Sequence, residues 1–316
     1  MRVCLMIEGQ EDVTWDQWRA LALIAEEHGF ETLFRSDHYL SVEGRTERGS
    51  LDAWSTLAGL AAITSRIRLG TLVSPATFRH PSVLAKSAAT VDQISGGRVE
   101  VGLGAGWNEL EHRSYGFPFP DRIGTRMEVM QEQAEIVARS FEGGPFSFEG
   151  KHYRVENLDA LFKPVQQPRP PIVMGGSGAP RGMAIAARWA DEYNTVFVGP
   201  EEAGERCERW KRAWADGGRD PEQLVFSVMT AVLVGADEGE VRARAERLAE
   251  KRGTDVDSML PGMRSNGVAG TVEEAAERLR EYERAGVQRI MLQHLLHEDV
   301  DAVELIGREL IPLVSG

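Results

Sequence analysis

Hydrophobic residues along the chain form short runs that alternate with longer amphipathic segments. Eight runs have the length and apolar content of buried strands, at residues 2–7, 30–37, 67–75, 99–106, 171–178, 193–199, 224–234 and 287–293. Segments with helical periodicity follow these strands, at residues 14–28, 51–65, 81–94, 126–141, 181–189, 200–215, 238–251, 271–285 and 300–310. Strands that alternate with helices form parallel βαβ units, so the pattern predicts an α/β protein.

Eight such units in 316 residues match the size of a (β/α)8 TIM barrel. A doubly wound sheet is the structural alternative, but that fold rarely needs eight evenly spaced repeats. Three interruptions, at residues 107–124, 143–170 and 253–270, indicate insertions, and the middle one alternates in the manner of a β-hairpin. Because no linker composition divides the chain, we expect a single domain over residues 1–316.

The stretch LGTLVSPATFRHP, residues 69–81, begins as an apolar strand and ends among polar residues and two prolines. In a (β/α)8 barrel the active site lies at the carboxyl ends of the strands. Glycine, polar or titratable residues follow four other strands, in SDHY (36–39), GLGAGWNE (102–109), GGSGAPR (175–181) and QHLLH (293–297). We therefore predict that these five strand ends form one rim that carries the chemistry.

Three features of this rim have alternative interpretations. Asp37 and His38 fit a catalytic pair, or a turn whose carboxylate begins a helix. The glycines at residues 175–178 fit phosphate binding by backbone amides and a helix dipole, or a tight strand-to-helix turn. Trp107 fits a wall of a substrate pocket, or a cover over the apolar core.

Composition narrows the class of protein. The net charge is −13, from 49 acidic and 36 basic residues, and no basic block is present, which argues against nucleic acid as a partner. Only five apolar residues in a row precede Glu8, too few for a signal peptide or a membrane span. Cys4 and Cys207 lie far apart, so neither a metal site nor a disulfide framework is expected. This cysteine usage favours a cytoplasmic location.

Several segments together resemble the luciferase-like monooxygenase superfamily, and in particular its branch that uses the deazaflavin coenzyme F420. The most specific is GTLVSPATFRHPSVLAKSAATVDQISGGRVEVGLGAGWNELEH, residues 70–112. The segments SDHY, PPIVMGGSG and TVEEAAERLREYERAGVQRIMLQ agree in order and spacing. The resemblance implies a (β/α)8 barrel with insertions and an enzyme that transfers a hydride between F420 and a small organic substrate.

The resemblance also implies where the cofactor lies. Its ring is expected over the ends of the second, third and fourth strands, where a non-proline cis peptide is expected at Thr71–Leu72. Its phosphate is expected at the glycine turn. The implied cofactor-binding residues are Asp37, Thr71, Leu72, Ser74, Gly106, Asn108, Gly176, Ser177 and Gly178.

Further site residues follow as hypotheses. His38 is the expected acid/base because an ordinary histidine titrates near neutrality, and Asp37 would orient it or bind elsewhere. Tyr39, Phe78 and Trp107 would wall an apolar substrate pocket. The resemblance implies a cofactor with a strongly anionic phospholactyl oligoglutamate tail. Cations would meet this tail, and we consider Arg181, Arg79 and Lys86 for that role.

One position departs from the family pattern. Relatives that oxidise glucose 6-phosphate have a glutamate just after the strand-four glycine turn, where this chain has Trp107. Glu109 lies two residues further on and is not expected to point the same way. Sugar-phosphate dehydrogenase activity is therefore not expected.

Two other functions remain open at the level of sequence. The first is an FMN-dependent monooxygenase that takes reduced flavin from a partner reductase and uses oxygen. The second is a non-catalytic barrel that binds a cofactor or ligand. A separate F420 or flavin reductase is a possible partner, and the apolar segment 51–64 suggests a homodimer.

Overall fold

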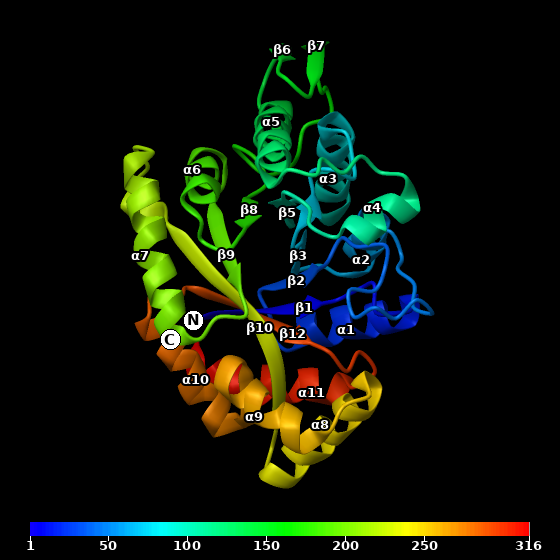
Figure 1. Cartoon of the computed structure of the whole chain (residues 1–316), viewed down its shortest axis with the longest axis vertical. Helices are drawn as coiled ribbons and strands as arrows, with labels where there is room; N and C mark the ends of the chain where they lie inside the picture. The colour runs from blue at the N-terminus through cyan, green and yellow to red at the C-terminus, as the bar shows by residue number, and fades with distance from the viewer. Residues whose placement is uncertain (316) are drawn as a thin grey trace.

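The computed structural model describes residues 1–315, which include a closed barrel of eight parallel strands surrounded by helices (Figure 1). The barrel strands are β1 (Arg2–Ile7), β2 (Thr32–Arg35), β3 (Arg68–Thr71), β5 (Val99–Gly104), β8 (Ile172–Gly175), β9 (Glu192–Val196), β10 (Val225–Gly235) and β12 (Arg289–His294). Each pairs with the next in this order, and β12 returns to β1, so the sheet closes. The prediction of a (β/α)8 barrel with insertions is confirmed.

The outer helices match the predicted helical segments closely. They are α1 (Trp15–Glu27), α2 (Ala53–Ile63), α3 (Pro81–Ser95), α5 (Ile123–Phe141), α6 (Pro180–Trp189), α7 (Pro200–Asp216), α8 (Glu238–Arg252), α10 (Val272–Arg284), α11 (Val300–Leu305) and the terminal α12 (Ile311–Val314). Local sequence signals determine where helices begin. Thr14 and Gln17 form a capping box at the start of α1, as expected for an N-cap threonine. No helix within residues 1–315 is long and apolar enough to cross a membrane.

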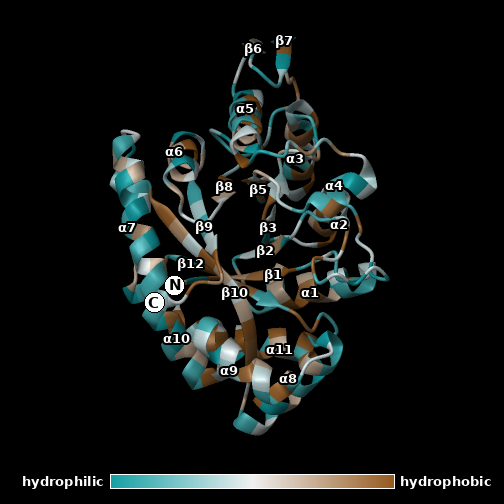
Figure 2. Cartoon of the chain, viewed as in Figure 1, coloured by the Kyte–Doolittle hydropathy of each residue, from teal (hydrophilic) through white to brown (hydrophobic). Residues whose placement is uncertain are grey.

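Side-chain alternation along the strands separates two apolar regions. Outward-facing residues such as Val3, Leu5 and Ile7 join a large cluster between the strands and the helices. Inward-facing residues such as Cys4 and Met6 join a smaller cluster inside the barrel. Figure 2 shows brown along β1 and β10, and outer helices in which brown and teal alternate.

The three predicted insertions hold secondary structure of their own. Residues 143–170 contain the antiparallel hairpin of β6 (Phe146–Glu149) and β7 (Arg154–Leu158), as predicted. Residues 107–124 contain α4 (Glu109–Tyr115), and residues 253–270 contain α9 (Val256–Asn266) and most of β11 (Val268–Thr271), none of which was predicted. These elements are short, and α9 holds Pro261 within it, so the sequence periodicity was too weak to show them.

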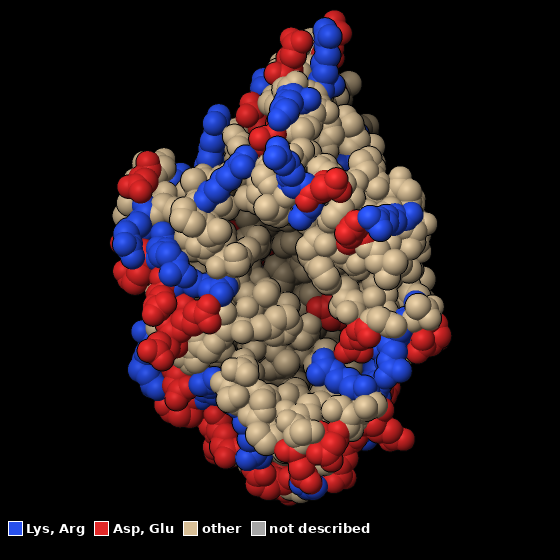
Figure 3. Space-filling model, in the orientation of Figure 1, with Lys and Arg blue, Asp and Glu red and all other residues tan. Residues whose placement is uncertain are grey.

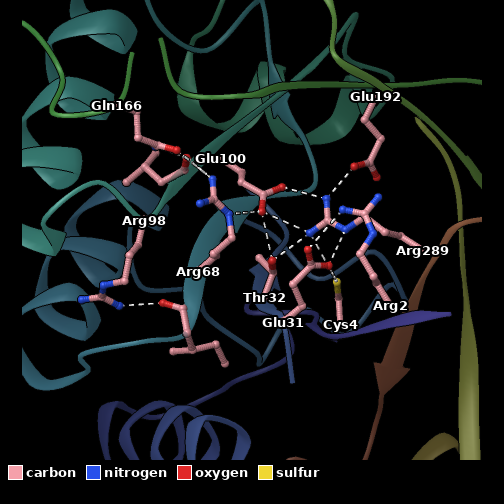
Figure 4. Close-up of polar contacts among 12 residues, drawn as sticks. Arg2, Cys4, Glu31, Thr32, Arg68, Arg98, Glu100, Gln166, Glu192 and Arg289 are labelled. Atoms are coloured by element: carbon pink, nitrogen blue, oxygen red, sulfur yellow. Dashed lines mark hydrogen bonds and ion pairs between the residues drawn. The ribbon is translucent and has the colours of Figure 1, made fainter. Parts of the chain in front are cut away.

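The amino-terminal end of the barrel is closed by a buried ion-pair network centred on Arg289 (Figure 4). The Arg289 guanidinium contacts Glu100 at 2.9 Å and Glu31 at 2.8 Å, and it also pairs with Glu192. Arg68 contacts Glu100 from the other side at 2.7 Å. Burial tends to raise the pKa of Glu100, but Arg289 and Arg68 outweigh it and lower the pKa to about 2. The network thus ties β12, β5, β9 and the start of β2 together.

We predict that Arg289→Met destabilises the fold by about 3–5 kcal/mol, because it leaves buried carboxylates without their partner. The measurement is urea unfolding followed by circular dichroism. The control is Arg308→Met, which removes an exposed pair with Glu304 and should leave the midpoint almost unchanged. Equal midpoints for the two variants would contradict a structural role for Arg289.

Candidate active site

A cavity of about 1210 Å³ opens at the carboxyl ends of the barrel strands. It appears in Figure 3 as the hollow in the middle of the face shown, with walls that are largely uncharged. All eight barrel strands contribute to its lining. Seven do so with residues at or just beyond their ends, among them Glu8, His38, Leu72, Gly106, Gly176, Phe197 and Gln293, and the long β10 does so with Thr230. The five strand ends predicted to form one rim therefore do converge.

The floor on one side of this cavity is the link between β3 and the short β4 (Ser74–Pro75). Here the structure corrects one prediction, because the cis peptide joins Leu72 and Val73, one bond later than expected. The Leu72 amide still donates to the Arg35 carbonyl of β2 at 2.8 Å, so the pairing with β2 continues through residue 72. Pairing with β5 resumes at Ser74, opposite Leu103. Leu72 and Val73, which we call the shelf, line the cavity.

Two glycines of β5 allow the shelf to lie where it does. A β-carbon on Gly102 would overlap the carbonyl oxygen of Thr71, and one on Gly104 would lie 2.6 Å from the Val73 side chain. Any larger residue at either position would push the two backbones apart. The spacing of these glycines thus serves a close approach of strands at the cavity floor.

His38 lines the cavity beside the shelf, and its Nδ1 lies 2.8 Å from the Glu111 carboxylate. Glu111 is fully buried, and its other oxygen accepts hydrogen bonds from the backbone amides of Tyr39 and Leu40. Burial tends to lower the pKa of His38, but the hydrogen bond and the charge of Glu111 outweigh it, so the pKa is raised. The Trp107 ring lies edge-on to His38 at 5.6 Å. This arrangement places a histidine at the cavity wall beside a carboxylate that favours its protonated form.

Glu111 and Glu8 are site residues that the sequence reasoning missed. Glu111 belongs to α4, which was not predicted. The sequence signal for this helix was Asn108, an N-cap residue whose side chain accepts a hydrogen bond from the Glu111 amide. Glu8, at the end of β1, lines the cavity and accepts hydrogen bonds from Gln10 at 2.7 Å and Gln293 at 2.6 Å. Glu109 points away, as expected, and pairs with the exposed Arg113.

Asp37 does not contact His38 and is not part of the cavity wall. Its carboxylate accepts hydrogen bonds from Ser74 Oγ and Arg79 Nη1, both at 2.6 Å, and it is 1% exposed. Adjacent residues at a strand end face opposite sides, which is why Asp37 points behind the shelf while His38 points into the cavity. Arg79 also pairs with Asp52 at 2.8 Å, so its charge is used within the protein and is not available to a cofactor tail.

Other predicted contacts also lie outside the cavity wall. Thr71 and Ser74 are buried behind the shelf and bond to each other, and Asn108 caps α4. Tyr39 and Phe78 pack against each other and against Phe117, which draws both rings away from the cavity. Local sequence could not show this packing, since the partner Phe117 belongs to an insertion.

Six of the residues predicted for the site do line the cavity. They are His38, Leu72, Gly106, Trp107, Gly176 and Ser177.

The glycine turn between β8 and α6 differs from the expected three-amide cradle. The Gly176 amide donates to the Asn194 carbonyl at 3.0 Å, and the Gly178 amide donates to the Tyr193 hydroxyl at 3.1 Å. Ser177 remains exposed at the cavity wall. Of the predicted cations only Arg181 lines the cavity, joined by Arg206 of α7, while Lys86 lies on an exposed face of α3. Anion binding here would therefore rest on Ser177 and arginines.

Residues 3–289 match the sequence model of the luciferase-like monooxygenase family, so the chain belongs to this family. It is 32% identical to the pyrimidine monooxygenase RutA of Bradyrhizobium sp., over 78% of this chain and 69% of the relative. It is 25% identical to the 5,10-methylenetetrahydromethanopterin reductase of Methanopyrus kandleri, over 92% of this chain and 93% of the relative. A solved F420-dependent secondary alcohol dehydrogenase, in complex with an F420-acetone adduct, superposes with a TM-score of 0.85 at 20% identity, covering 100% of this chain and 99% of that one.

The family is one of oxidoreductases and monooxygenases, and the sequence relatives include both a reductase and a monooxygenase. The likeness to the alcohol dehydrogenase shows the shared fold.

We predict that Gly102→Ala destabilises the protein by about 1–3 kcal/mol or more, because the added methyl overlaps a backbone carbonyl that cannot rotate away. Thermal unfolding followed by calorimetry measures the effect. Gly143→Ala is the matched control, since no atom lies within 4 Å of the position its β-carbon would take. If Gly102→Ala were as stable as this control, the close approach would not be a constraint on the fold.

Proposed function

We propose that this protein transfers a hydride between coenzyme F420 and a small organic substrate. The observation that carries the proposal is the His38–Glu111 pair, which faces a large cavity directly beside the shelf of Leu72 and Val73. The resemblance of residues 70–112 to the F420-dependent branch supports the choice of cofactor. The similarity to a methanopterin reductase and to an F420-dependent alcohol dehydrogenase is consistent with it.

The residues present fit a flat tricyclic cofactor with an anionic tail. The shelf, Ala105 and Gly106 form an apolar floor, and Gly104 and Gly175 lack side chains that would fill the space above it. Ser177 and Arg181 lie at the wall where a phosphate would be held. When bound, F420 carries the hydride on a ring carbon and reacts poorly with oxygen.

The chain's own residues handle the proton and the surroundings of the substrate. His38, whose protonated form Glu111 favours, would give a proton to the substrate in the reducing direction and take one back in the oxidising direction. Glu111 holds the ring orientation by accepting from Nδ1, which leaves Nε2 as the proton-transfer atom. Trp107 partly shields His38 from solvent.

The substrate is expected to be small and largely apolar. Methionine is the most frequent apolar side chain of the wall, at Met127, Met130, Met174, Met229, Met259 and Met263. Methionine side chains adapt to ligands of different shape, so they suit an apolar substrate and place little constraint on its outline.

The raised pKa of His38 gives a test that needs no substrate. In the native protein His38 should stay protonated to a pH above its ordinary 6.5. Glu111→Gln should lower the pH at which it titrates, since only the weaker charges of Glu8 and Asp37 then oppose burial. Histidine NMR titration measures this, with His38→Gln to assign the signal. A titration that Glu111→Gln leaves unchanged would contradict the pairing.

His38→Ala should lower turnover by about 10²–10⁴-fold while F420 still binds, because only proton transfer is lost. The assay is the oxidation of reduced F420 with a panel of small ketones and unsaturated carbonyl compounds. The control is His80→Ala. His80 caps α3 and does not line the cavity. Unchanged turnover in His38→Ala would remove His38 from the mechanism.

A flavin-dependent monooxygenase is the second candidate, favoured by the 32% identity to the pyrimidine monooxygenase. Titration with F420 and, separately, with FMN should quench tryptophan fluorescence at lower concentration for F420. Trp107→Phe should reduce the amplitude, since Trp107 lies at the cavity wall. Tighter binding of FMN would favour the monooxygenase, and binding of neither would contradict both functions.

A further inference from the structure

Arg209 of α7 is a partly buried arginine for which residues 1–315 provide no hydrogen bond or ion pair, and its Nε atom is shielded from solvent. Glu205 lies four residues earlier, at the spacing of a helical ion pair, but the two do not pair. Arg206, by contrast, does pair with Glu202 at the same spacing. The guanidinium of Arg209 therefore turns away from the carboxylate that its own helix offers.

The Arg209 guanidinium lies beside the glycine turn between β8 and α6. Its Nη2 lies 3.4 Å from the point that a β-carbon on Gly178 would occupy, and the Arg206 stem lies equally close. The Tyr193 hydroxyl accepts a hydrogen bond from the Gly178 amide and so lies next to the same turn. Burial raises the pKa of Tyr193, while the Gly178 amide and the charges of Arg206 and Arg209 act in the opposite direction. Both arginines are thus close to the end of the cavity assigned to the phosphate.

Arginines of α6 and α7 gather near this turn although the whole chain carries a net charge of −13. Arg181 is 52% exposed and has Glu128 at 3.8 Å, and Arg206 has Glu202, whereas Arg209 has no acid to offset it. Figure 3 shows blue side chains beside the hollow in the region of α6 and α7, with red ones among them. An arginine that served only solubility would extend into water, as the exposed Arg212 does on the next turn. An uncompensated guanidinium packed on a glycine turn is instead arranged for an anion.

We propose that Arg209, together with Arg206, binds a second anionic group beyond the phosphate, namely a carboxylate of the oligoglutamate tail of F420. The inference rests on the proposed function and extends it, because Arg209 lies outside the cavity wall that Arg206 lines. A ligand must continue past Ser177 and over Gly178 to reach it. FMN ends at its phosphate and has no group to place there.

Binding measurements by isothermal titration test this with three probes on the whole protein. The probes are F420 with its glutamate tail, the form that ends at the phospholactyl group, and the riboside chromophore without phospholactate. Arg209→Gln removes the charge, and Arg212→Gln removes one charge from the exposed face of the same helix as the matched control.

Arg209→Gln should lower the affinity for the full coenzyme about 10-fold and make that affinity less dependent on salt. Its affinity for the riboside should stay within about twofold of the native value. Arg212→Gln should bind all three probes as the native protein does. The inference is overturned if Arg209→Gln binds the full coenzyme normally, or weakens all three probes equally. Failure of the native protein to bind any probe would overturn the proposed function as well, so the two failures can be told apart.

Discussion

The site depends on how closely two strands approach each other at the cavity floor. The carbonyl of Thr71 lies against Gly102, and the Val73 side chain lies against Gly104, at distances that no side chain on β5 would allow. Because the backbones meet here, β3 stops at Thr71 and resumes as β4 at Ser74, with Leu72 and Val73 turned into the cavity. The shelf, the cavity above it and the position of Asp37 behind it follow from this contact.

The two ends of the barrel have different physical roles. At the amino-terminal end, Arg289 and its carboxylates fill the interior with a buried ion-pair network that tolerates little change. At the carboxyl end, glycines and methionines leave an open cavity, and charged groups such as His38 and Glu111 are held at its edge. Stability and chemistry are thereby separated along the barrel axis, as in other (β/α)8 proteins.

The sequence was sufficient for the fold but only partly for the site. Hydrophobic periodicity located all eight barrel strands and the hairpin insertion, since both signals are local. It also placed His38, Leu72, Gly106 and the glycine turn at one rim. It could not show that Glu111, 73 positions from His38, would become its partner, because that pairing depends on how α4 folds over β2. Tyr39, Phe78 and Asn108 were misplaced for the same reason, since packing and capping within the insertion decide their directions.

The central claim is that a planar ring lies on the shelf with its reactive edge toward His38. A crystal structure of the protein with F420 tests it most directly. We expect ring density over Leu72 and Val73, contact between the substrate side of the ring and His38, and a tail that leaves past Ser177 toward α7. Density elsewhere on the protein, or side chains that occupy the space above the shelf in the complex, would contradict it.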